Sequence, residues 1–289
     1  METILEKINE WLTLALNTIS ATLLNHSFDG LNDILQFGIG QITETPATFG
    51  GGTILSLVQG ISTNVILPVA GLILTYSFVY NMIALMTERN HMAEIEWFHL
   101  FKELFKTACC VMLVTNCFTI TMAFFDLGTW LVNTAGGNVT VFLDKGSIVD
   151  ALTSTTDFGP ALANVLFSFV ACFIILICAG LILATIWSRL ISIYILIALA
   201  PIPMATFMQS EWIGAIGQNF IKTLLGYALQ GLVIYVLVRI MGMLFSAVAP
   251  TIIGTGDITG LVKIVVLTGV CTGTILRSLS LSKSVLNAM

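Results

Sequence analysis

Residues 160–208, PALANVLFSFVACFIILICAGLILATIWSRLISIYILIALAPIPMATFM, contain a single formally charged side chain, that of Arg189. About 20 apolar residues at 1.5 Å each cross a hydrocarbon core of about 30 Å, so the stretch is long enough for two crossings. We therefore predict a transmembrane hairpin that turns at residues 187–189, with the indole of Trp187 and the guanidinium of Arg189 at one membrane face. The alternative is one very long helix. Pro201 and Pro203 are expected to bend or end the second helix of the hairpin.

The composition of the whole chain indicates that its solvent is a lipid bilayer. Charged residues make up 9% of the 289 residues and the mean hydropathy is +0.98, whereas about 25% of the residues in an ordinary soluble domain are charged. The net charge of −5 argues against a general nucleic-acid-binding surface, because phosphate contact needs clustered Lys and Arg. The six cysteines include no C-x-x-C pair, and we interpret them as small apolar core residues.

The N-terminal region, residues 1–52, is predicted to be amphipathic and helical and to precede a transmembrane domain, residues 53–289. Apolar residues recur at helical spacing in its first part, Ile8, Trp11 and Leu12 among them. We interpret these three as a candidate partner-binding surface, because a helix that binds anionic lipid is usually rich in Lys and Arg and this one is acidic. Packing on the chain's own membrane helices is the open alternative. A separate short apolar element is expected at residues 31–42.

Two spans are predicted upstream of the hairpin, at residues 62–86 and 104–125. The charged segment between them contains His91, Glu94 and His99, which share a helical face only loosely. No H-E-x-x-H set accompanies them, so we predict no metal site.

Downstream of the hairpin, residues 209–222 are expected to be a connection before a fifth span at 223–238. Arg239 then either ends that span at the interface or is held inside the assembly, where a charge usually marks function. A last apolar segment at 258–281 either crosses the membrane or re-enters it. The predicted fold is therefore all-α: a polytopic integral membrane protein with five or six transmembrane helices.

The basic residues at the span ends predict the orientation of the chain in the membrane. Arg89, Lys102 and Lys106 lie between the first two spans, so this loop is expected to be cytoplasmic. Alternation then places the acidic loop 126–159 outside the cytoplasm, Arg189 inside, and the N-terminus outside.

Enzyme classes find no support in the sequence. It contains no H-E-x-x-H, no G-x-S-x-G and no G-x-x-x-x-G-K-[ST] motif, so we predict no catalytic residue and no cofactor. A proton-coupled transporter is expected to carry Asp, Glu or His inside its spans, and here the predicted spans are nearly free of them.

The order of these features resembles the TrbL-like family, the polytopic membrane subunit of conjugative type IV secretion systems. The resemblance rests on the amphipathic N-terminal region, the two spans, the central loop, the W-x-R stretch, and a helix that ends A-L-A-P-I-P-M-A at residues 198–205. It covers about residues 50–280. It implies a non-enzymatic channel subunit of the bacterial cytoplasmic (inner) membrane that helps to move DNA–protein or protein substrates.

The resemblance also implies partners and a set of conduit residues. The partners are the other membrane subunits of the secretion system, its ATPases, further copies of the chain in a homo-oligomer, and, transiently, the translocated DNA–protein substrate. The candidate structural residues of the conduit are Trp187, Arg189, Pro201, Pro203 and Arg239. The alternative function is a self-contained small-solute transporter or channel, which interrupted helices at Pro201, Pro203 and Pro250 would suit. Genes for secretion ATPases beside this one would favour the first function.

Overall fold

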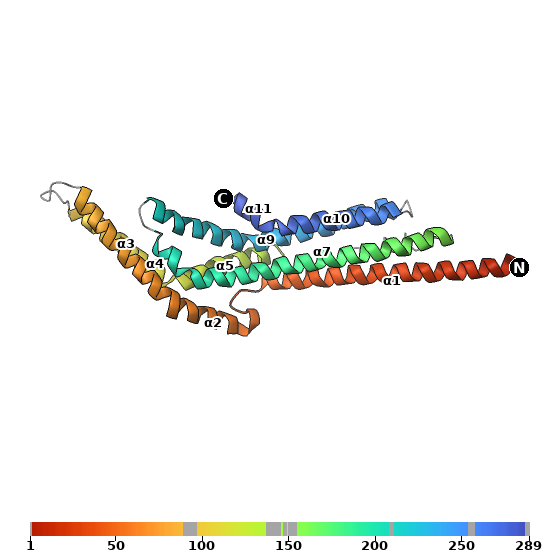
Figure 1. Ribbon diagram of the computed structural model, residues 1–289, viewed down its shortest axis with the longest axis horizontal. Coiled ribbons are helices and arrows are strands. Elements are labelled where there is room, and N and C mark those ends of the chain that lie inside the picture. Colours follow the sequence, from red (N-terminus) through yellow and green to blue (C-terminus); the bar gives the residue numbers. More distant parts are fainter. Residues whose placement is uncertain are drawn as a thin grey trace. The chain divides into compact units, whose positions relative to one another are not determined.

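The regular structure of the chain is helical wherever it is described. The computed structural model describes residues 2–88, 97–136, 146, 149, 155–207, 211–253 and 258–286, and in this part of the chain every element is a helix (Figure 1). Three helices are long and apolar enough to cross a membrane, or up to five if each of two bent pairs is one span. The chain is therefore an all-α polytopic membrane protein, as predicted. The upper count of five takes Phe158–Leu199 as one span and includes the bent pair Gly260–Leu276 and Ser278–Val285, so it is not the same set of spans as predicted.

The first element, α1 (Glu2–Thr43), is one helix of 42 residues. The predicted separate element at 31–42 is therefore wrong. Asp29 and Gly30 lie inside the helix, and a Cβ at Gly30 would lie 3.8 Å from the side chain of Leu176. A glycine at such a packing position does not have to end a helix.

The predicted first span is confirmed and begins earlier than expected. Helix α2 (Thr53–Ile61), the π-helical turn η2 (Ser62–Ile66) and α3 (Leu67–Glu88) follow one another directly, and Thr53–Thr87 qualifies as a membrane span. Pro68 has no backbone N–H and its ring collides with the carbonyl four residues earlier. That carbonyl belongs to Asn64, inside η2, and a π turn is one of the ways in which a helix accommodates such a position.

The predicted second span at 104–125 is broken. Helix α4 (Trp97–Thr115) and helix α5 (Cys117–Thr134) meet at Asn116 with a bend of 65°. The side-chain amide of Asn116 donates to the carbonyl of Met112 at 2.9 Å, and such local bonds compete with the helical backbone pattern. Because α5 continues to Thr134, the first residues of the predicted loop 126–159 are helical.

The predicted hairpin is wrong, because α7 (Phe158–Leu199) is a single helix of 42 residues. Residues 187–189 include no Gly or Pro and continue the helix without a turn. The membrane sides predicted for the segments after this turn were assigned by assuming that the turn exists. Without the turn, that assignment has no basis. The end of the helix was predicted correctly: α7 stops two residues before Pro201, and a short helix, α8 (Pro201–Ala205), follows.

The described residues of the C-terminal part form three more helices. Helix α9 (Glu211–Ile253) has 43 residues, so the predicted connection at 209–222 and the predicted span start at 223 are wrong. Arg239 therefore lies within α9 and not at a helix end. Helices α10 (Ile258–Leu276) and α11 (Ser278–Val285) meet at Arg277 with a bend of 50°.

The helices form two compact units. Unit 1 comprises Met1–Thr43, Val132–Trp187 and Val233–Ser278; unit 2 comprises Glu44–Leu131, Ser188–Leu232 and Leu279–Met289. The long helices α7 and α9 contribute to both. The division at residue 52 that the sequence suggested stays a prediction.

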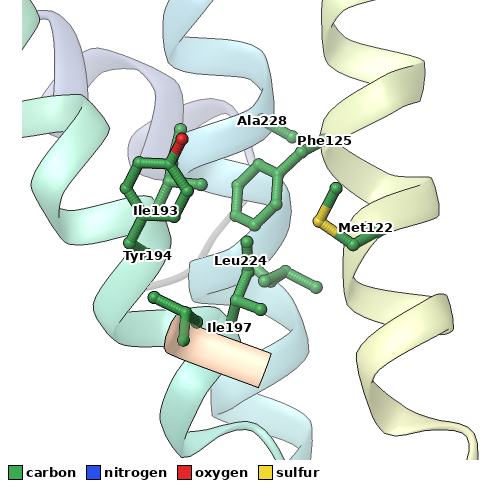
Figure 2. Packing of buried hydrophobic residues seen from close by; sticks show 8 residues of the cluster. Met122, Phe125, Ile193, Tyr194, Ile197, Leu224 and Ala228 are labelled. Carbon is green, nitrogen blue, oxygen red and sulfur yellow. The ribbon is translucent and has the colours of Figure 1, made fainter. Parts of the chain in front are cut away.

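Unit 2 has an apolar core to which α2, α5, α7 and α9 contribute. Figure 2 shows Phe125 of α5 among side chains of α7 and α9. The buried members are Val58, Met122, Phe125, Ile193, Tyr194, Ile197, Leu224 and Ala228. The hydroxyl of Tyr194 donates to the carbonyl of Pro46 at 3.0 Å, which fastens the segment before α2 to this core.

Candidate functional site

Arg189 is the most unusual side chain of unit 2, because it is a buried charge in an apolar helix. Only 8% of its surface is exposed, and its Nε donates to the backbone carbonyl of Tyr227 on α9 at 3.3 Å. Within the described part of the chain it forms no ion pair with an acidic side chain. A neutral carbonyl compensates the desolvation of a guanidinium only in part, so burial of Arg189 costs free energy. A charge at such a position in an apolar helix usually has a functional role.

Helices α5, α7 and α11 contact α9 around Tyr227. We call residues 226–228, together with the residues that contact them, the α9 junction. Arg189 of α7 contacts the carbonyl of Tyr227. From α11, Ser282 Oγ donates to the carbonyl of Gly226 at 2.7 Å, and Lys283 Nζ lies 5.7 Å from the centre of the Tyr227 ring. These helical carbonyls can accept such bonds because each oxygen has two lone pairs.

The third helix at the α9 junction is α5, which contacts α9 through a glycine. A Cβ at Gly128 would lie 2.6 Å from the carbonyl oxygen of Ala228, a separation that real Cβ atoms do not reach. A glycine at position 128 therefore sets how closely α5 approaches α9. At the α9 junction, two cationic side chains, Arg189 and Lys283, are held by one turn of a single helix.

The substitution Gly128→Ala should lower the stability of the chain. The new methyl group would force α5 and α9 apart, and overpacking of this kind costs about 1–3 kcal/mol. The thermal midpoint in detergent should fall by about 2–4 °C for each kcal/mol. The matched control is Gly71→Ala in α3, because nothing lies within 4 Å of a Cβ at Gly71. An equal midpoint for the two variants would show that the close approach at Gly128 does not limit packing.

Pro201 and Pro203 lie on α8, which packs in an apolar cluster of its own. Residues of α8 and its surroundings pack against α3 and the bend between α4 and α5; the buried set is Ala70, Val114, Cys117, Ala200, Met204 and Ala205. A Cβ at Gly217 of α9 would lie 2.7 Å from the carbonyl oxygen of Pro203 and 2.6 Å from Cα of Phe207. The chain reversal after Pro201 is thus held closely by the start of α9.

The remaining candidate residues do not gather at one place. Trp187 is 49% exposed on α7 and Arg239 is half-buried on α9; both belong to unit 1. The partner-surface candidates Ile8, Trp11 and Leu12 are exposed on α1 by 53%, 68% and 38%. Sequence reasoning missed Tyr227, Lys283, Gly128 and Gly217. For Gly128 and Gly217, the only available signal in the sequence was a glycine within an apolar helix.

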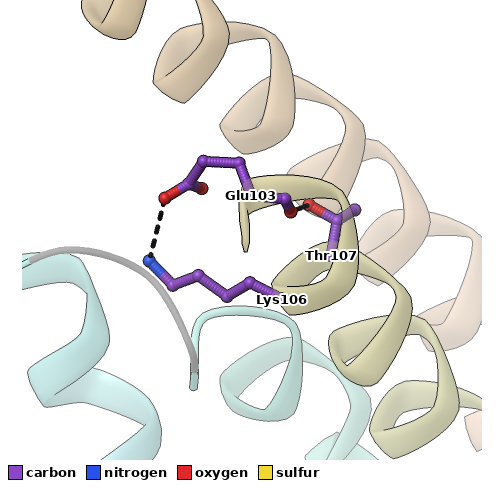
Figure 3. A network of polar contacts seen from close by, with 3 residues as sticks. All are labelled: Glu103, Lys106 and Thr107. Atoms are coloured by element: carbon purple, nitrogen blue, oxygen red, sulfur yellow. Dashed lines mark hydrogen bonds and ion pairs between the residues drawn. The ribbon is translucent and has the colours of Figure 1, made fainter. Parts of the chain in front are cut away.

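The ion pair that the structure describes near the start of α4 is a local one. Lys106 Nζ lies 3.8 Å from a carboxylate oxygen of Glu103, and Thr107 Oγ1 donates to the carbonyl of Glu103 at 2.9 Å (Figure 3). A partly exposed pair one turn apart contributes little to stability. His91 and Glu94 lie outside the described residues, and the described ones include no group of three potential metal ligands.

A comparison with known families matches more than half of the chain. The model described as "TrbL/VirB6 plasmid conjugal transfer like protein" matches residues 31–201. No curated protein and no solved structure gives a significant match. The matched region runs from the middle of α1 to Pro201 and includes Trp187 and Arg189. It ends before Pro203, Tyr227 and Arg239.

Proposed function

The chain belongs to the TrbL/VirB6 plasmid conjugal transfer-like family, and on this premise we propose that it is a channel subunit of a conjugative type IV secretion system. Membership of the family implies a subunit of a conjugal transfer machine. We propose in addition that the chain helps to form the passage for DNA–protein or protein substrates across the bacterial cytoplasmic (inner) membrane. The observation that carries it is the family match, which covers α7 with its buried charge.

The buried guanidinium of Arg189 supports a role within a helix assembly. Replacing a buried charge with an apolar side chain is often neutral or stabilising, so stability alone gives no reason for an arginine here. Charges at membrane depth usually face a bundle interior or a water-filled cavity and mark a pathway. We propose that Arg189, the α9 junction and the reversal at Pro201 and Pro203 are parts of the framework of the conduit, with Trp187 and Arg239 as further structural positions.

The partners of the chain follow from the proposed role. The family implies interaction with other transfer components; the proposal adds a homo-oligomer, an energy supply from the ATPases of the system, and brief contact with the substrate. Exposed Ile8, Trp11 and Leu12 are proposed to bind a neighbouring membrane subunit. The N-terminus and the segment between α5 and α7 are proposed to lie outside the cytoplasm. The role requires no cofactor and no catalytic residue.

Deletion of the gene tests this function. In a donor strain that carries the system, deletion should reduce conjugal transfer to the background of a strain without the machine, and a plasmid copy should restore it. The tagged chain should fractionate with the cytoplasmic membrane and co-purify with other transfer subunits. Normal transfer after deletion, together with a defect in the uptake or efflux of a small solute, would favour the transporter alternative.

A further inference from the structure

Arg189 uses only part of its hydrogen-bonding capacity within the described residues. A guanidinium carries five N–H donors in a planar fork, and the hydrogen bond of Arg189 runs from Nε to the carbonyl of Tyr227 at 3.3 Å. The N–H groups of its two Nη atoms therefore have no acceptor there. Neither Nη atom is among the fully enclosed side-chain atoms without a hydrogen bond, so both keep some accessible surface. A residue that is 8% exposed thus still has donors that a ligand can reach.

Lys283 is held against the same turn of α9. Its aliphatic stem packs on Gly226, where an added Cβ would lie 3.1 Å from Cγ of Lys283, and its Nζ lies 5.7 Å from the centre of the Tyr227 ring. The hydrogen bond from Ser282 to the carbonyl of Gly226, at 2.7 Å, fixes α11 in this place. An aromatic ring attracts an ammonium group and leaves its N–H donors available to an anion.

No carboxylate of the described residues neutralises either cation of the α9 junction. The acidic residue of α5 is Asp126, which is exposed and forms no ion pair with Arg189 or Lys283. Two like charges held against one residue, Tyr227, repel each other, and the burial of Arg189 adds a desolvation penalty. An anion bound at the α9 junction would offset both unfavourable contributions.

We propose that the α9 junction binds a phosphate group through Arg189 and Lys283. The planar fork of an arginine matches two oxygens of one phosphate, and a lysine binds phosphate as a point charge. A phosphate has a further oxygen for the second cation. The low exposure of Arg189 suits one such group and not an extended polyanion, and the chain has a net charge of −5. The inference does not depend on the proposed channel function.

Thermal unfolding of the full chain in a neutral detergent tests the site with inorganic phosphate as the probe. Chloride at the same ionic strength is the reference. At a phosphate concentration ten times the dissociation constant, the thermal midpoint of the wild type should rise by about 3 °C. Arg189→Leu should weaken phosphate binding by at least about tenfold, because it removes hydrogen bonds from a charged group.

Two further variants keep the test decisive if Arg189→Leu fails to fold, which its midpoint in phosphate-free buffer reveals. Lys283→Gln should weaken binding by about threefold, because a partly exposed charge contributes less. Arg189→Lys keeps the charge without the fork and should also bind more weakly than the wild type. The matched control is Lys222→Gln, an exposed cation of the same helix, which should respond to phosphate as the wild type does.

A second probe identifies the source of the phosphate group. Short-chain phosphatidylglycerol is added to the same detergent and compared with short-chain diacylglycerol, which lacks the phosphate. Stabilisation by phosphatidylglycerol alone would identify a lipid headgroup as the ligand, and stabilisation by inorganic phosphate would identify a site that also takes the free ion. An absence of stabilisation by both probes would overturn the inference, as would equal stabilisation of the wild type and the Arg189 variants. Binding needs no transfer activity, so a negative result leaves the deletion test of the proposed function unaffected.

Discussion

Replacing Arg189 with leucine should reduce conjugal transfer by at least about tenfold, which corresponds to 1.4 kcal/mol, while the chain still inserts into the membrane. The guanidinium is 8% exposed and its partner is the carbonyl of Tyr227, at 3.3 Å. Loss of a hydrogen bond from a charged group costs about 1.5–3 kcal/mol, and the buried charge is itself penalised by several kcal/mol. The thermal midpoint of the Arg189→Leu variant should therefore equal that of the wild type or exceed it.

This split between transfer and stability identifies the role of Arg189. If the arginine only packed helices, transfer and thermal midpoint would change together. Arg189→Lys keeps the charge but lacks the planar, branched donor group, and we expect it to support intermediate transfer. The matched control is Lys222→Gln, because Lys222 is an exposed cation on α9. Wild-type transfer by Arg189→Leu would contradict the proposed role of this residue.

Replacing Pro201 and Pro203 together with alanine should also reduce transfer by at least about tenfold. Each proline lacks a backbone N–H and collides with the carbonyl four residues earlier, so without them α7 can continue past Leu199. A continued helix would carry Met204 and Ala205, now 1% and 0% exposed, out of their cluster with α3. Burying a methionine side chain contributes about 1.5–3 kcal/mol, so the thermal midpoint should fall as well.

The single variant Pro203→Ala is the control for the double variant. Pro201 remains in it and still ends α7, so transfer should stay near the wild-type rate. Transfer is scored against the amount of chain in the membrane fraction, which separates loss of function from loss of protein. If the double variant is present at the normal amount and transfers normally, the two prolines end a helix and have no part in translocation.

The sequence was informative where a single residue type decides the local structure. Pro201 and Pro203 together remove two backbone donors within three residues, which is a covalent property, and the predicted end of α7 was correct. Length and apolar composition likewise predicted membrane helices, because they depend on no tertiary contact.

The sequence was misleading where a distant partner decides. Trp187 and Arg189 fit a turn at a membrane face and a helix interior equally well. In the structure they lie within α7, and the guanidinium of Arg189 contacts the carbonyl of Tyr227, 38 residues away along the chain. Asn116 breaks a span without any Gly or Pro. In this case the accompanying contact is local, because the side-chain amide bonds the carbonyl of Met112 four residues earlier, and the hydrophobic pattern does not encode that bond either. The α9 junction was not predictable because it depends on residues far apart in the sequence. Gly128 is informative only once Ala228 lies against it.

The π turn η2 sets the rotational phase of α2. A turn closed by bonds from residue i to i+5 holds one residue more than an α turn, and one residue rotates a helix by about 100°. Val58, 6% exposed in the core of unit 2, lies upstream of that extra residue. Without it, a helix continuous with α3 would direct Val58 about a quarter of a turn away from Phe125 and Ile197. The face that α2 presents to the core thus depends on the number of residues between Ile61 and Leu67 as much as on its own sequence.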